Sequence, residues 1–251
     1  MTSSLNKRIA ALALPAIIVN ITTPLLSIAD VAIAGHLGDT ICIAAIAVGS
    51  TAFNLLYWLL GFLRMGTSGL TAQAHGAGTY YGCRLIAKRG LAIAISAGLL
   101  ICALGFPIGT IAMHLLDVPA SAFDAATQYF FICVWGAPAV LGTFVLTGWF
   151  VGMQNTRIPM YVSLIIDIFN ILLSILLAIM CDMGITGIAT GTLAAQWLGF
   201  ILLLLNYLKK IRSLKTASVT HSATTADKSA YGITRLFKVN ADIFLRTLCL
   251  V

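Results

Sequence analysis

The chain has 251 residues, of which 60% are hydrophobic and only 9% are charged. A water-soluble domain of this length carries about a quarter charged residues, so the composition excludes a soluble globular domain and indicates a protein embedded in lipid. The net charge of +7 comes from 15 Lys and Arg against eight Asp and no Glu. These basic residues are spread over the polar breaks between apolar segments, so we interpret them as a topology and lipid-headgroup signal and expect no nucleic-acid partner.

Six apolar segments are long enough to cross a membrane, since a helical span needs about 20 residues. Only helices suit such segments, because backbone polar groups cannot stay unpaired in lipid. The segments cover roughly residues 9–35, 41–66, 90–115, 127–152, 159–181 and 184–208. We therefore predict an all-α fold, a polytopic membrane bundle of six transmembrane helices.

The polar breaks alternate between basic and base-free. Breaks around His36, Asp117 and Asp182 hold no Lys or Arg. The basic residues lie before the first span, around the second break, at the fourth break and after the sixth span: Lys7, Arg8, Arg64, Arg84, Lys88, Arg89, Arg157, Lys209, Lys210, Arg212, Lys215, Lys228, Arg235, Lys238 and Arg246. Because Lys and Arg resist translocation, this pattern predicts a multi-pass protein of the inner (plasma) membrane with a cytoplasmic N-terminus.

The first span contains Pro15, Pro24 and Asp30. Each proline removes a backbone hydrogen bond and bends a helix, either as a static kink or as a point of movement. An ionised carboxylate inside the membrane costs a few kcal/mol, so Asp30 is a candidate cation-binding residue. A buried carboxylate readily takes up a proton, whereas several oxygen neighbours would suit Na⁺. The alternative is that Asp30 lies at the outer interface and is simply hydrated.

The fifth span carries Asp167, Asn170 and Ser174 at spacing i, i+3 and i+7, which places all three on one helix face. The sixth span adds Thr192, together with Thr190 and Gln196. This polar stripe either lines a site or consists of hydrogen-bonding groups that join helices. The sequence has no P-loop, HExxH or GxSxG motif, so we expect no enzyme and no cofactor.

The character of the chain changes after the sixth span. Residues 209–238 are basic and then rich in Ser, Thr and Ala, which is typical of a flexible linker. Residues 239–251 begin another apolar helix with about a dozen residues, too few to cross a membrane. We predict three parts: a six-helix lobe at 1–208, a cytoplasmic linker at 209–238, and the truncated start of a seventh helix at 239–251.

Several stretches, in this order, are similar to those of one transporter family. They read ALALPAIIVN, SIADVAIAGHLG, GTSGLTAQAHGAG, LTGWFVGMQNTRIPM, NILLS and VNADIFLRTLCLV. The chain thereby resembles the N-terminal half of a MATE (multidrug and toxic compound extrusion) transporter, of the DinF-type branch. The resemblance implies two six-helix lobes and drug efflux driven by inward H⁺ or Na⁺.

The resemblance also implies a site. Asp30 matches the family's acid in the first helix, and Asn170 and Thr192 match its polar partners. Four residues after that Asn the family often has an Asp, where this chain has Ser174; Asp167 lies one turn earlier as a further candidate. The implied function is cation-coupled (H⁺ or Na⁺) multidrug antiport. It needs no cofactor beyond the coupling ion, takes a drug-like substrate that is often cationic or amphipathic, and works with a missing C-terminal lobe.

Three alternatives remain open from the sequence. A lipid-linked flippase of the same superfamily would favour a cationic cavity, although no Lys or Arg is expected in the middle of the six spans. A membrane enzyme acting on lipids would need converging His, Asp or Glu. A non-transporting half-module would act as an assembly subunit or be a decayed product.

Overall fold

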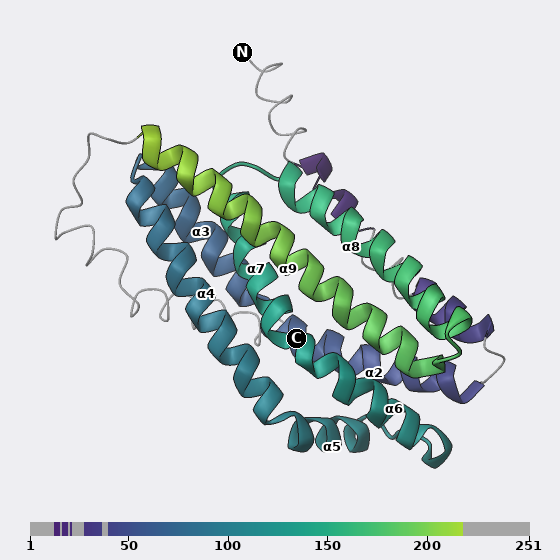
Figure 1. Ribbon diagram of the computed structural model, residues 1–251. Coiled ribbons are helices and arrows are strands. Elements are labelled where there is room, and N and C mark those ends of the chain that lie inside the picture. The colour runs from purple at the N-terminus through teal and green to yellow at the C-terminus, as the bar shows by residue number, and fades with distance from the viewer. Residues whose placement is uncertain (1–12, 16, 20, 22–27, 37–39, 218–251) are drawn as a thin grey trace.

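The computed structural model describes residues 13–15, 17–19, 21, 28–36 and 40–217. Every regular element in this part of the chain is a helix (Figure 1). After the helical residues 28–36 come α2 (Thr40–Leu59), α3 (Phe62–Gly76), α4 (Tyr80–Ala103), α5 (Gly105–Leu115), α6 (Ala120–Cys133), the 3₁₀ turn η1 (Val134–Gly136), α7 (Ala137–Gly152), α8 (Arg157–Ile175), the π-helical turn η2 (Leu176–Met180) and α9 (Gly184–Ala217).

The predicted polytopic all-α membrane fold is confirmed. Five spans among the described residues are long and apolar enough to cross a membrane: Ile41–Gly76, Tyr80–Ala103, Ala120–Gly152, Arg157–Met180 and Gly184–Ser213. Of the span expected at 9–35, residues 13–15, 17–19, 21 and 28–36 are described and helical. Pro24 lies outside the described residues.

The third span differs from its expected position at 90–115. The membrane-length helix is α4, from Tyr80 to Ala103, and the residues after it form the separate helix α5. Pro107 explains the break, because it has no N–H to donate to the carbonyl of Ala103 four residues earlier. At the other end, Lys88 lies two turns inside α4, where its long apolar stem still allows the ammonium group to reach water.

The second and sixth spans are both longer than expected. The second continues through α3 to Gly76, so Arg64 lies twelve residues before the helix end, roughly 18 Å at 1.5 Å per residue. The expected end of this span at residue 66, next to Arg64, is therefore wrong. Helix α9 continues to Ala217, so residues 209–217 of the expected linker are helical. The remainder of that linker and the segment 239–251 lie outside the described residues.

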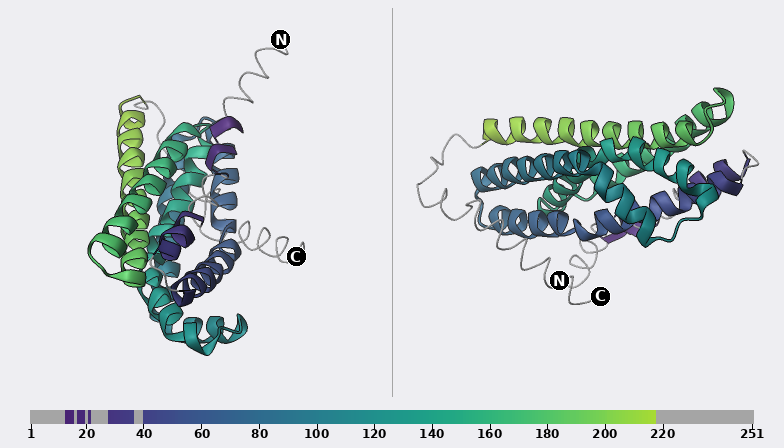
Figure 2. Two further views of the ribbon diagram at one scale, coloured as in Figure 1. Left: turned by 90° about the vertical axis from the view of Figure 1, so that its right-hand side faces the viewer. Right: turned by 90° about the horizontal axis from the view of Figure 1, so that it is seen from below.

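Most described basic residues gather at one end of the bundle, where α3, α7 and α9 end and α4 and α8 begin (Figure 2). They are Arg84, Lys88, Arg89, Arg157, Lys209, Lys210 and Arg212. Asp117 and Asp182 lie in the turns at the opposite end, after α5 and before α9. We call these the basic end and the base-free end. The alternation seen in the sequence is thus a polarity of the folded bundle.

Helix α7 is the centre of the packing, with α3, α4 and α9 all in contact with it. Small residues allow this approach: Gly98 of α4 lies against the backbone of Pro138, and Gly148 of α7 lies against the backbone carbonyl of Arg64. Trp149 is fully buried, and its indole Nε1 donates a hydrogen bond to the carbonyl of Cys83, 2.9 Å away. In lipid there is no hydrophobic driving force between helices, so such packing contacts and hydrogen bonds stabilise the bundle instead.

The span α6–η1–α7 is interrupted at its middle. Pro138 has no N–H to donate, and the carbonyl of Val134 accepts from the N–H of Ala137 in the 3₁₀ turn and also from the thiol of Cys102 on α4, at 3.2 Å. Beside it, Trp197 Nε1 of α9 donates to the carbonyl of Trp135 at 3.3 Å. Side chains of two neighbouring helices thus hydrogen-bond to the backbone at the interruption.

A methyl group at Gly187 should destabilise the bundle. Its Cβ would lie 2.6 Å from the backbone nitrogen of Ala178 on η2, and backbone cannot move aside as a flexible side chain can. We expect Gly187→Ala to cost about 1–3 kcal/mol, the usual cost of overpacking, and to lower the apparent Tm of the full-length protein in detergent. Gly76→Ala is the matched control, since nothing lies within 4 Å of its Cβ position. Equal Tm values for the two variants would contradict this packing.

Candidate functional site

Three of the polar residues expected at the site form one hydrogen-bonded cluster. Asn170 and Ser174 on α8 are buried, with 1% and 0% of their surface exposed. Asn170 Nδ2 donates to Thr192 Oγ1 on α9 at 3.2 Å, and Ser174 Oγ donates to Asn170 Oδ1 at 3.3 Å. The Thr192 hydroxyl itself donates to the carbonyl of Ile188 at 3.0 Å. These hydrogen bonds join α8 to α9.

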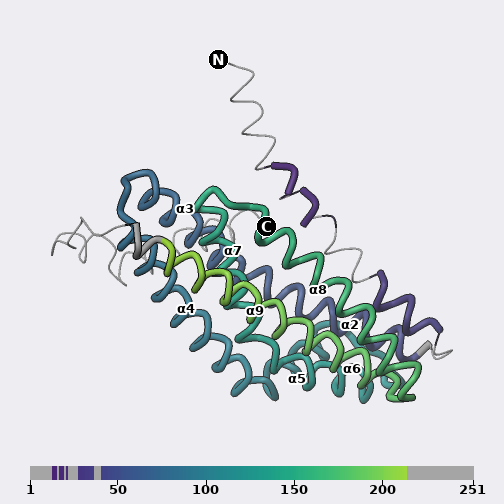
Figure 3. Tube along the Cα trace, turned by 45° about the horizontal axis from the view of Figure 1, so that its top comes forward, coloured from purple at the N-terminus to yellow at the C-terminus, as the bar shows by residue number. Residues whose placement is uncertain are grey.

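Two glycines set the distance between α8 and α9, which run side by side (Figures 1 and 3). A Cβ at Gly191 would lie 2.6 Å from Ser174 Oγ and 3.0 Å from Ser174 N. One turn earlier, Gly187 lies equally close to the backbone of Ala178. This pair at spacing four lets the backbones approach, and Thr192 follows Gly191 directly, so the same approach brings its hydroxyl to Asn170.

Asp30 lies in the helical segment 28–36 and is 6% exposed. Its Oδ1 atom is buried and has no hydrogen-bond partner among the residues that the structure describes. Tyr129 and Cys133 of α6 lie within electrostatic range of its carboxyl group. A dry carboxylate oxygen without a partner is costly, so this atom is placed to take up a proton or a cation.

Tyr129 joins Asp30 to the polar cluster. Its side chain is 3% exposed, and its hydroxyl is within hydrogen-bonding reach of Thr192 and Cys133. Gly49 of α2 holds the ring in place, since a Cβ at that position would lie 2.5 Å from ring atom Cδ1. The sequence analysis missed this residue. Tyr129 and Cys133 stand four apart on an apolar span, a spacing that ordinary helix packing also produces, so no sequence signal singles them out.

The other sequence candidates lie around this cluster or outside it. Asp167 is half-buried one turn before Asn170 and has a polar or electrostatic interaction of its own. Thr190 donates to backbone carbonyls of its own helix, and Gln196 lies against Gly136. Pro15 is buried. In the described part of the chain, no three His, Cys, Asp or Glu side chains lie close enough together to hold a metal ion.

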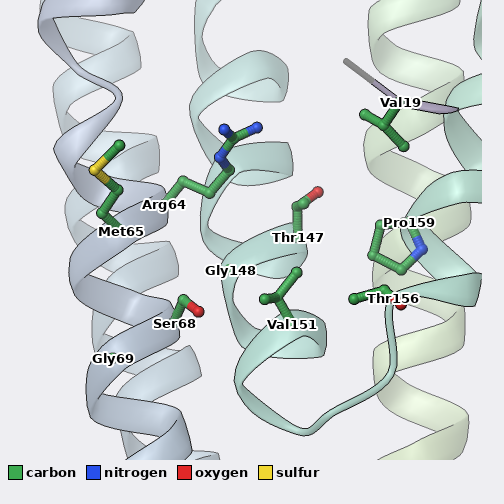
Figure 4. A pocket seen from close by; sticks show the side chains of 10 residues that line it. All are labelled: Val19, Arg64, Met65, Ser68, Gly69, Thr147, Gly148, Val151, Thr156 and Pro159. Atoms are coloured by element: carbon green, nitrogen blue, oxygen red, sulfur yellow. The ribbon is translucent and has the colours of Figure 1, made fainter. Parts of the chain in front are cut away.

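A separate cavity of about 470 Å³ lies toward the basic end, between α3, α7 and the start of α8 (Figure 4). None of the residues of the Asp30 cluster lines it. Its lining consists of Val19, Arg64, Met65, Ser68, Gly69, Thr147, Gly148, Val151, Thr156 and Pro159. The molecule therefore has two distinct polar regions at different depths.

Comparison with known proteins identifies relatives along the whole chain. The MatE family model matches residues 15–176. The DNA damage-inducible protein F of Escherichia coli K12 is 37% identical over 250 residues, which is 100% of this chain and 53% of that protein. The probable multidrug resistance protein NorM of Thermotoga maritima is 24% identical over 200 residues, 78% of this chain and 43% of that protein. The chain thus spans about half the length of the curated relatives it matches.

Solved structures share the fold. A MOP superfamily transporter from Pyrococcus furiosus superposes with a TM-score of 0.79 at 20% identity, covering 96% of this chain and 52% of that one. The MATE transporter VcmN of Vibrio cholerae in its bent form gives 0.77 at 18% identity, over 97% of this chain and 53% of that one. At this identity the likeness concerns the fold alone, and it again covers half of each transporter.

Removing the central amide of the cluster should weaken the contact between α8 and α9. Asn170→Ala deletes both hydrogen bonds that Asn170 makes with Thr192 and Ser174, and leaves a small buried void. We expect a loss of about 1–2 kcal/mol in the free energy of unfolding, measured by denaturant titration of the purified full-length protein. Asn54→Ala on α2 is the control, because Asn54 is exposed. If both variants unfold at the same denaturant concentration, the cluster does not hold the helices together.

Proposed function

We propose, from the premise that this chain belongs to the MatE family of membrane transporters, that it is one lobe of an antiporter that exports small drug-like molecules in exchange for a cation. The observation that carries the proposal is the dry, unpartnered Oδ1 of Asp30 beside the Tyr129–Thr192–Asn170 cluster. The relative from Thermotoga maritima is described as a probable multidrug resistance protein, which supports the same substrate class. A second lobe would complete the transporter.

The exchange rests on the charge of Asp30. An ionised carboxylate at this depth costs a few kcal/mol, and binding a cation removes that cost. The cation-bound and cation-free states therefore favour different arrangements of the helices around Asp30. A substrate that prefers the cation-free arrangement and a cation that prefers the other expel one another by linkage. The helix contact beside Asp30 is held by the hydrogen bonds among Asn170, Ser174 and Thr192. This contact would stay in place while Asp30 binds and releases the cation. Asp167 lies one turn before Asn170.

We favour H⁺ over Na⁺ as the coupling ion. A Na⁺ site needs several oxygen ligands, and Asn170 Oδ1 and Thr192 Oγ1 each already use one of their two lone pairs to accept a hydrogen bond within the cluster. Asp30 Oδ1 is the unpartnered oxygen of this cluster in the described structure, and one oxygen suffices for a proton. Transport should then respond to a pH gradient and remain unchanged when Na⁺ is replaced by K⁺.

The orientation follows from the charge polarity of the bundle. Lys and Arg resist translocation, so we assign the basic end to the cytoplasm and the protein to the inner (plasma) membrane with a cytoplasmic N-terminus. The 470 Å³ cavity then lies on the cytoplasmic side and the Asp30 cluster toward the outer side. A cation arriving from outside and a substrate arriving from the cytoplasm would each meet a polar region first.

Neutralising Asp30 should uncouple transport. Asp30→Asn keeps the size of the side chain but can neither bind nor release a proton. We therefore expect pH-gradient-driven efflux of ethidium from proteoliposomes to fall to the rate of protein-free liposomes. Asp124→Asn, at an exposed carboxylate near the start of α6, should leave efflux unchanged. Undiminished, pH-dependent efflux by the Asp30 variant would disprove the assigned role.

Tyr129→Phe should slow transport without abolishing it. The variant removes the hydroxyl that reaches Thr192 and Cys133, while the ring still fills its position against Gly49. A hydrogen bond worth about 1 kcal/mol corresponds to roughly a fivefold change in rate or apparent proton affinity. We also expect the pH profile of ethidium efflux to be displaced. Tyr161→Phe, at an exposed tyrosine of α8, serves as the control and should match the unmodified protein in rate and pH profile.

A further inference from the structure

Arg64 has an unusual position for a membrane arginine. It lies in the third position of α3, twelve residues from the end of that helix. Figure 4 shows its side chain extending from α3 across the face of α7, with the guanidinium directed away from the loop that leads to Thr156. An arginine at this depth commonly extends toward the nearer interface. Here it is turned toward the membrane interior.

The direction of α3 explains this orientation. Side chains on a helix tilt toward its N-terminus, and α3 runs toward the basic end, so its side chains tilt away from that end. Gly148 fixes the place further, because it packs directly on the backbone of Arg64 and allows α7 to approach. The exposed side chain of Arg64 therefore lines the cavity with its guanidinium at the end farther from Thr156, as a consequence of the helix direction and the α3–α7 contact.

Among the described residues, no acidic side chain balances this charge. The described lining of the cavity contains no Asp or Glu, and Arg64 takes part in no ion pair there. Charged side chains at membrane depth face a partner or a water-filled cavity and commonly mark the path of a ligand. In the described structure the charge of Arg64 is thus available to an anionic ligand.

The rest of the cavity suits a ligand with one anionic group. Ser68, Thr147 and Thr156 contribute three hydroxyls, and hydroxyls donate readily to carboxylate or phosphate oxygens. Thr156 is only 7% exposed, and its Oγ1 has no hydrogen-bond partner in the described part of the protein. Val19, Met65, Val151 and Pro159 make the other walls apolar. A volume of about 470 Å³ is within the usual range for small-molecule sites.

We propose that this cavity binds an amphiphilic anion, a carboxylate or phosphate attached to an apolar body, with Arg64 as its counter-charge and Thr156 as a hydrogen-bond donor. A cationic compound is disfavoured in this cavity because it would meet Arg64, so a cationic substrate such as ethidium would bind elsewhere in the complete transporter. As a statement about exported substrates the inference rests on the proposed transport function, whereas the binding itself does not. The same chemistry is offered by a soluble amphiphile and by an anionic phospholipid.

The test is a binding titration with two matched probes. The full-length protein is placed in phosphatidylcholine nanodiscs, and dodecyl phosphate and dodecyltrimethylammonium are titrated below their micellar concentrations, without any ion gradient. We expect the anion to bind more tightly than the cation. Arg64→Gln should raise the Kd for dodecyl phosphate by at least about tenfold, since the variant loses a charge-assisted hydrogen bond. Lys88→Gln, at an exposed basic residue outside the cavity, should leave it unchanged.

Two further variants guard against misfolding of Arg64→Gln. Arg64→Lys keeps the charge and should bind with intermediate affinity, and Thr156→Val keeps the shape and should weaken binding about fivefold. Equal affinity for the two probes, or equal Kd values for Arg64→Gln and Lys88→Gln, would overturn the proposal. Because no transport is measured, failure here leaves the cation coupling at Asp30 untouched, and failure of that coupling leaves this binding untouched.

A third arm separates the two sources of the anion. The titration is repeated in nanodiscs that contain phosphatidylglycerol. If the anionic lipid weakens dodecyl phosphate binding in the unmodified protein but not in Arg64→Gln, the membrane supplies the occupant. If the Kd is unchanged, the occupant is a soluble amphiphile. Either result supports an anion site at Arg64.

Discussion

Every backbone polar group of a lipid-embedded chain must find its partner within the protein, and this constraint governs the structure. It limits the described spans to helices and makes each interruption depend on a neighbour. At the middle of α6–η1–α7, where Pro138 cannot donate, the carbonyl of Val134 accepts from the N–H of Ala137 and from the thiol of Cys102 on α4. The interruption is therefore a point where three helices are fixed to one another. The same constraint ends α4 before Pro107, which has no N–H to continue the helical hydrogen bonds.

The second constraint is that helix backbones must approach closely. Lipid is as apolar as the side chains, so the hydrophobic effect does not drive the helices together and close packing has to stabilise their contacts. Glycines at these contacts allow the close packing that holds the helices together, as a hydrophobic core does in a soluble protein. Gly187 and Gly191 bring α9 to α8, and the polar cluster follows from that approach because Thr192 adjoins Gly191. Gly148 does the same for α3 and α7, and it thereby fixes Arg64 at the edge of the cavity. The two polar regions therefore follow from helix contacts that the fold needs in any case.

The sequence predicted well those features that depend on composition and helical period. The fold class, the alternation of charge, and the shared face of Asn170 and Ser174 all follow from patterns along a single helix. The sequence did not predict the features that depend on contacts between different helices. The full length of the second span was missed because Arg64 and the small residues after it lower the local hydropathy, although a buried helix tolerates both. Tyr129 was missed because its partners lie on three other elements, and nothing along α6 distinguishes it from a packing residue.

The two polar regions carry opposite charges at different depths, and two elements pass both of them. Pro159 of α8 lines the cavity and Asn170 of the same helix belongs to the Asp30 cluster, eleven residues or roughly 16 Å away. The first span likewise places Val19 at the cavity and Asp30 at the cluster. In the proposed exchange, a change of charge at Asp30 would bias the packing of these two elements and so reshape the cavity at their other end. An anion held there by Arg64 would be released through the same two elements that respond to the cation, which accounts for coupling without any contact between the two ligands.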